Sequence, residues 1–203
     1  MKHQISIRRH SSLLAGLAVV ALVVGSADAG DDADAAKALP EYTFDGLQRV
    51  PNTKITALYL RIDADFGSYD KIAIHDCYVA FRKDWQHDQN ESSRIKVSDQ
   101  DMTRIKTYLS EEFRRVFTDR LTASGETVTT AAGTGVLMVR PAIINLDVSA
   151  PDRSDPPPRG IYSSESAGQA TLYLELYDSV TGQLLARAID IEVAGARGYI
   201  SVR

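Results

Sequence analysis

The chain has 203 residues, a formal net charge of −4 and a single cysteine. This length suits one domain with one hydrophobic core, and a lone cysteine cannot form an intramolecular disulfide, so stability must come from packing. An acidic chain without a basic stripe disfavours nucleic-acid binding and attachment to an anionic membrane surface.

The first 29 residues have the pattern of a cleaved secretory signal peptide. Lys2, Arg8 and Arg9 precede an apolar run over residues 13–24, and residues 27–29 (Ala-Asp-Ala) supply small side chains for cleavage. The run is shorter than the roughly 20 apolar residues that a spanning helix needs, so we expect no integral membrane span after cleavage. We predict cleavage after Ala29 and export to the periplasm, by the general or the twin-arginine route.

The leader also contains no cysteine, which a lipoprotein signal needs at its cleavage point. We therefore predict that the mature protein is not a lipoprotein and that any association with the outer membrane is peripheral. Residues 30–38 are rich in Asp and Ala, with nothing bulky to bury, and they predict a flexible tether. A single domain is predicted over residues 39–203.

This domain is predicted to be α+β, with a mainly antiparallel twisted sheet of about four to five strands and one long amphipathic helix on one face, in the order β-α-β-β-β. Strands are predicted over residues 57–62, 71–81, 136–148, 170–177 and 184–193. A bulge near His75 explains a slip in the alternation of 71–81. Pro141 cannot donate to a ladder, which places its strand at an edge or a bulge.

The helix is predicted from Ser98 to about Thr122. Ser98 followed by Asp101 is typical of a helix start, and Gly125 suits a helix end. Its apolar stripe consists of Met102, Ile105, Leu109, Phe113, Val116, Phe117 and Leu121.

Several segments carry a resemblance to a known family. They are Tyr69-Asp70-Lys71-Ile72-Ala73-Ile74, Trp85, the helix start at Ser98, and the Asp178-Ser179-Val180-Thr181-Gly182-Gln183-Leu184-Leu185-Ala186 hairpin. On these, residues 40–193 resemble a bacterial envelope family known as domain-of-unknown-function family 3313 (DUF3313).

The resemblance implies an exported or outer-membrane-associated protein with no established activity. It also implies a C-terminal helix after the last strand, for which the chain as given has no counterpart. Without that helix, part of one sheet face would be uncovered. Either residues 194–203 and residues 41–69, predicted as an irregular lead-in that packs on the domain, cover this face, a partner does, or the chain is truncated after Arg203.

Only a small set of polar residues is a candidate for metal binding or catalysis. His75, Cys77 and His87 could hold zinc, or pair as a nucleophile and a base, although a buried thiol with incidental imidazoles is the favoured interpretation. The alternative function is a small-molecule or hydrolytic site in a helix–sheet pocket near His75, Asp76 and Tyr78. Carboxylate pairs such as Asp63 with Asp65 are interpreted as solvated loop residues. We assign no catalytic, cofactor-binding or metal residue.

Three aromatic residues are the candidate partner contacts: Trp85, Tyr173 and Tyr177. Trp85 would be a contact anchor if exposed, but the favoured interpretation is a plug folded over the sheet. Tyr173 and Tyr177 share the outward face of a strand, as a ligand platform or as cross-strand packing. The leading hypothesis is an exported, non-enzymatic envelope protein that binds an unidentified envelope protein.

Overall fold

The computed structural model describes residues 39–92, 96–148 and 168–193, which form one mixed eight-stranded sheet with two α-helices. The predicted signal peptide (1–29), the predicted tether (30–38) and residues 194–203 lie outside the described residues. The α+β class is confirmed. The predicted count of about four to five strands is too low, and the sheet is mixed rather than mainly antiparallel.

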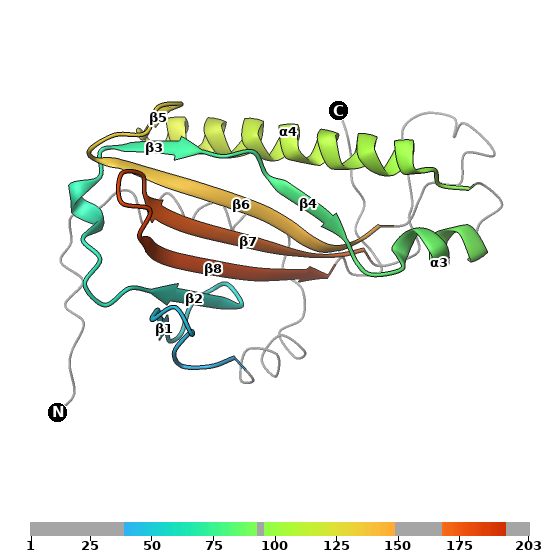
Figure 1. The fold of residues 1–203 in the computed structure, drawn as a ribbon, viewed down its shortest axis with the longest axis horizontal. Coiled ribbons are helices and arrows are strands. Elements are labelled where there is room, and N and C mark those ends of the chain that lie inside the picture. The colour runs from blue at the N-terminus through green and yellow to red at the C-terminus, as the bar shows by residue number, and fades with distance from the viewer. Residues whose placement is uncertain (1–38, 93–95, 149–167, 194–203) are drawn as a thin grey trace.

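The elements in chain order are β1 (Gln48–Val50), β2 (Ala57–Leu60), a 3-10 turn (Phe66–Ser68), β3 (Lys71–Ile74), β4 (Tyr78–Phe81), α3 (Trp85–Ser92), α4 (Asp99–Ala123), β5 (Thr127–Thr129), β6 (Val136–Asp147), β7 (Gln169–Asp178) and β8 (Leu184–Val193). Two runs of antiparallel neighbours, β1–β2 and β6–β7–β8, are separated in the chain by β3, β4, two helices and β5 (Figure 1). The strand order is β1-β2-β8-β7-β6-β3-β5, with β4 also paired to β6. Helix α4 runs along the β3–β4 side, and β1 and β2 form the opposite edge.

The parallel part of the sheet arises from the crossover through α4. The strand predicted over 71–81 is divided into β3 and β4 at residues 75–77, where the bulge was expected, and both halves run parallel to β6. Parallel neighbours need a long crossover, which α4 provides. Alternation of apolar residues does not reveal strand direction, so the sequence pattern could not predict this pairing.

Pro141 lies in an internal strand, which corrects the prediction of an edge position. On one side it faces Leu174 of β7. On the other side β3 has already ended, with the His75 N–H donating to the Val139 carbonyl at 2.9 Å, and β4 begins pairing only at Ala142. The missing N–H of the proline therefore falls beside the interruption of the neighbouring strand. The irregularity lies in that neighbour rather than at Pro141 itself.

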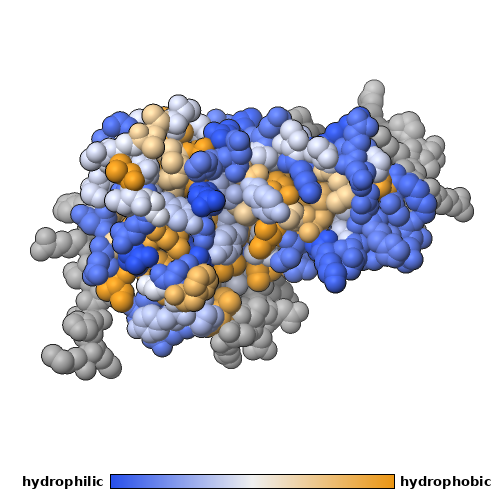
Figure 2. All heavy atoms as spheres, in the orientation of Figure 1, coloured by the Kyte–Doolittle hydropathy of each residue, from blue (hydrophilic) through white to orange (hydrophobic). Residues whose placement is uncertain are grey.

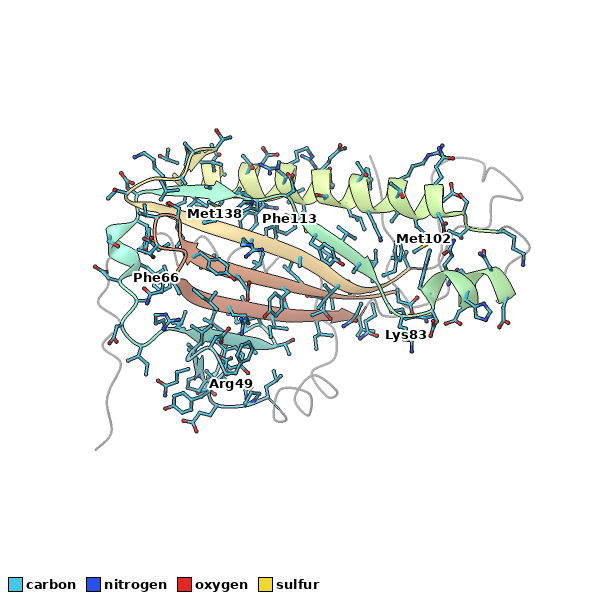
Figure 3. The ribbon with its side chains drawn as sticks, in the orientation of Figure 1. Arg49, Phe66, Lys83, Met102, Phe113 and Met138 are labelled. Atoms are coloured by element: carbon cyan, nitrogen blue, oxygen red, sulfur yellow. The ribbon has the colours of Figure 1, made fainter. Side chains whose placement is uncertain are left out.

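Helix α4 begins where its sequence predicts, but Val116 of the predicted apolar stripe is exposed (36%) because it lies beside the residues that face the sheet. The Ser98 hydroxyl accepts the Asp101 N–H at 3.2 Å, and the Asp101 carboxylate accepts the Ser98 N–H at 3.1 Å. Phe113 lies on the sheet side of the helix (Figure 3). The core beneath it is apolar and contains Phe66, Ile72, Ile74, Phe117, Leu121, Leu137, Val139, Leu174, Leu176, Leu185 and Ala186. One face of the sheet is thus covered by α4.

Candidate functional site

The sheet face opposite α4 carries a row of polar side chains. Side chains alternate along a strand, so Tyr173, Glu175 and Tyr177 of β7 point away from the core that contains Leu174 and Leu176. This is the face that the sequence predicted for both tyrosines.

Arg187 of β8 pairs in register with Glu175 and connects it to Asp45 of the lead-in. Its Nε and Nη2 donate to the Glu175 carboxylate at 3.0 and 2.7 Å. Its Nη1 and Nη2 donate to the two oxygens of Asp45, the first at 3.3 Å. Arg187 is only 8% exposed. We call these three residues the Arg187 clamp.

Two residues of the clamp, Arg187 and Asp45, have pKa values that keep them charged at neutral pH. Burial lowers the pKa of Arg187, but the hydrogen bonds that Arg187 donates to both carboxylates outweigh it, and the pKa lies above its ordinary value. Burial raises the pKa of Asp45, yet the hydrogen bonds that its carboxylate accepts from Thr43 and Arg187 leave that pKa below its ordinary value. A positive charge between two carboxylates is a stable arrangement at neutral pH.

The two tyrosines are tied to the same network. The Tyr177 hydroxyl donates to Glu175 at 2.5 Å and the Tyr173 hydroxyl at 3.4 Å. Guanidinium groups lie over both rings, Arg187 at 5.5 Å from the centroid of Tyr173 and Arg140 at 5.3 Å from that of Tyr177. Burial is the main cause that raises the pKa of Tyr173 to about 12, so it stays protonated at neutral pH.

This geometry suits a structural role better than a chemical one. Four of the five N–H groups of Arg187 are used by the two carboxylates. Little donor capacity is left for an external anion. Glu175 accepts hydrogen bonds from both tyrosines and from Arg187. The lowered pKa of Asp45 keeps its carboxyl group ionised at neutral pH, so Asp45 is not poised as a proton donor.

The clamp fixes the turn formed by residues 42–48, here called the N-terminal turn. Tyr42 and Gln48 form an antiparallel bridge. The Thr43 N–H donates to the Leu47 carbonyl at 2.9 Å, and the Leu47 N–H donates to the Thr43 hydroxyl at 3.0 Å. Leu47 is fully buried against Ala57 and Tyr59. The lead-in, predicted as irregular, is thus an ordered layer over part of this face.

Trp85 is the plug rather than an exposed anchor. It is 1% exposed, stacks on Phe81 with ring centroids 4.2 Å apart, and donates from Nε1 to the Val148 carbonyl at 3.0 Å. It begins α3, a helix that the sequence pattern does not predict. Hydrophilic side chains gather at this end of the molecule (Figure 2). A partner contact by Trp85 would require its side chain to leave this position.

The residues of the alternative site do not form an enclosed site. His75, Asp76 and Tyr78 are exposed at the β3–β4 interruption, and Asp76 forms an ion pair with Arg114 of α4 at 2.6 Å. A small-molecule or hydrolytic pocket needs walls that exclude water, which these exposed side chains do not provide.

The proposed zinc or nucleophile set is also dispersed. Cys77 is buried, and burial raises the pKa of its thiol to about 11, so it is a poor nucleophile. His87 lies exposed on α3 beside Glu91. Within residues 39–92, 96–148 and 168–193, no group of three His, Cys, Asp or Glu side chains could hold a metal ion. Asp65 accepts the Gly67 N–H at 3.0 Å and caps the 3-10 turn, a local structural role.

Sequence reasoning missed Asp45 and Arg187. The alternation of β8 indicates which face Arg187 occupies, but its acidic partner lies 142 residues away in the chain. The pairing depends on how the lead-in folds over the sheet.

The chain is therefore an α+β protein built on one mixed sheet, with α4 on one face and an ion-pair clamp on the other. Residues 34–198 match the model of a family described as protein of unknown function (DUF3313), and the chain belongs to this family. No curated protein and no solved structure matches it. Among the described helices, none is long and apolar enough to cross a membrane.

Proposed function

We propose that this protein is exported to the bacterial periplasm and acts by binding another envelope protein, without catalysing a reaction. The clamp is the observation that supports a binding role. Arg187 is the one charged residue among the described residues that is buried, and its charge is used to fix the N-terminal turn. Such an arrangement favours a surface of fixed shape rather than a reacting centre.

Export is supported by the leader, whose basic start, apolar run and small residues at 27–29 match a cleaved signal. The test is expression of the full chain, fractionation of the cells and determination of the mature N-terminus by mass spectrometry. We expect a periplasmic protein that begins at Gly30. A chain without residues 13–24 is the control and should stay in the cytoplasm. Full-length protein in the cytoplasm with an intact leader would contradict export.

Binding is tested by photocrosslinking in living cells. A photoreactive phenylalanine analogue replaces, one at a time, exposed apolar residues in different parts of the described surface: Phe44, Ile62, Tyr78, Tyr108 and Val180. We expect at least one position to give a discrete, light-dependent adduct with another envelope protein. The same substitutions in the chain without residues 13–24 should give none of these adducts. An exported chain that forms no adduct from any position would overturn the binding proposal.

A further inference from the structure

We propose that Phe44 is the anchor residue with which this protein enters an apolar pocket on a partner protein. The inference rests on the proposed binding function and names the part of the surface that performs it. Phe44 lies at the tip of the N-terminal turn and is 99% exposed. Tyr42, at the base of the same turn, is 53% exposed. No other large apolar side chain among the described residues exceeds 66% exposure.

The turn that carries Phe44 is held on every side. The Gly46 N–H donates to the Thr43 carbonyl at 3.1 Å, and Gly46 adopts a φ of +81°, which favours glycine. The residue after Phe44 is Asp45, whose side chain is bound by the Arg187 clamp and whose carbonyl accepts from Arg61 at 3.4 Å. Phe44 is thus an exposed aromatic ring on a fixed backbone.

Binding of this ring in a pocket is favoured because the backbone that carries it is already ordered before binding. Ordering a loop upon binding costs affinity, and a loop ordered in advance avoids that cost. Aromatic residues also dominate the energetic centres of protein interfaces. A tight turn with one protruding ring has a convex shape, so its complement is a concave apolar pocket.

A lipid bilayer fits the same ring less well. A phenylalanine side chain has about half the carbons of a myristoyl chain, and a single myristoyl chain gives only marginal membrane binding. The neighbouring Glu41 is exposed, and the chain is acidic, with a net charge of −4, which opposes an anionic lipid surface. We therefore infer that Phe44 enters a pocket of a partner protein rather than a lipid bilayer.

The first test compares position 44 with position 108. Tyr108 is an exposed aromatic residue (64%) on α4, away from the N-terminal turn, and serves as the matched control. With the photoreactive analogue in the exported full chain, we expect one discrete protein adduct from position 44 and none from position 108. A product twice the mass of the chain, or a lipid adduct alone, would overturn the inference.

The second test uses the partner identified from that adduct, in purified form. Phe44→Ser should raise the Kd at least ~10-fold, whereas Tyr108→Ser should change it less than ~2-fold. Both variants should keep the wild-type melting temperature, because both side chains are exposed. An unchanged Kd for Phe44→Ser would overturn the inference.

The third test examines the membrane directly. Phe44→Trp adds an exposed indole to a chain whose other tryptophan, Trp85, is 1% exposed. We expect no blue shift of its emission with vesicles of phosphatidylcholine alone or mixed with phosphatidylglycerol. A blue shift with either would favour lipid and overturn the inference. Adducts from other positions but none from 44 would refute the role of Phe44 and leave the binding function supported, whereas no adduct from any position would refute both.

Discussion

The two faces of the sheet are held by different forces. Under α4 the contacts are apolar, with Phe117 and Leu121 packed on Leu137 and Val139. On the opposite face an arginine between two carboxylates joins the lead-in to β7 and β8. Burial of each large apolar side chain contributes about 1.5–3 kcal/mol. A buried ion pair contributes little net stability but is costly to break. The first face contains the larger apolar core. On the second, the clamp and the buried Leu47 fix the position of the N-terminal turn.

The largest loss of stability is expected from a substitution in the core under α4. Phe117→Ala removes a side chain that is 1% exposed and leaves a cavity, so the free energy of unfolding should fall by about 3–5 kcal/mol. Urea denaturation measures this change. The neighbouring Val116→Ala is the control and should cost about 1 kcal/mol or less, since Val116 is exposed. Equal losses for both variants would mean that α4 does not pack as described.

Breaking the clamp should have the next largest effect. Arg187→Leu leaves Asp45 and Glu175 as unpaired, partly buried carboxylates, and should cost about 3 kcal/mol at neutral pH. Urea denaturation again measures the loss. Combining Arg187→Leu with Asp45→Asn and Glu175→Gln should recover most of it, because no buried charge remains. If the triple variant is no more stable than Arg187→Leu alone, the loss of stability comes from lost packing or hydrogen-bond geometry and not from unpaired charge.

A smaller effect is expected at the start of α4. Ser98→Ala removes the hydroxyl that accepts the Asp101 N–H, and should cost about 1 kcal/mol in thermal or urea unfolding. Thr107→Ala, at an exposed position within the same helix, is the control and should be neutral or slightly stabilising, because alanine is the better helix former. A loss as large for Thr107→Ala would contradict a specific capping role.

The smallest effect is a local loosening of the N-terminal turn in acid. The pKa of Asp45 is lowered in the folded protein, so its contribution to stability is present above the ordinary carboxylate range of about 4 and is lost as pH falls through the lower folded pKa. Carboxyl ¹³C shifts should give Asp45 a pKa below that range. Backbone resonances of residues 42–48 should follow this titration in the wild-type protein but not in Asp45→Asn. A pKa at or above the ordinary range would contradict the clamp.

The elements that sequence predicted well are those with local signals. The start of α4 follows from Ser98 and Asp101, and its end lies one residue beyond Thr122. Strand β8 has the predicted bounds, Leu184–Val193. β1 and β5 are three residues each, too short for an alternation pattern. Helix α3 was missed because Trp85 is its only large apolar residue, so it lacks an apolar stripe.

The face of the sheet on which a side chain lies was predicted correctly for β7 but not for all of β8. Alternation along β7 predicts that Leu172, Leu174 and Leu176 point inward, and these three residues are confirmed in the core. On β8, the alternation of Ile189, Ile191 and Val193 with Asp190 and Glu192 predicts that Val193 is buried, but Val193 is 46% exposed. Val193 ends β8 opposite Gln169 and, by alternation, shares a face with Arg187 rather than with Ala186 of the core.

The sequence by itself determined the class of the domain, the long capped helix and the face of β7 that carries Tyr173 and Tyr177, because caps and alternation act over a few residues. Only the tertiary structure decided that β3, β4 and β5 are parallel to β6, that Trp85 is buried, and that Arg187 clamps Asp45. These depend on contacts between distant parts of the chain, such as the 142 residues between Asp45 and Arg187. The exposure of Phe44 follows from the same long-range contact, since the clamp holds the turn that presents it.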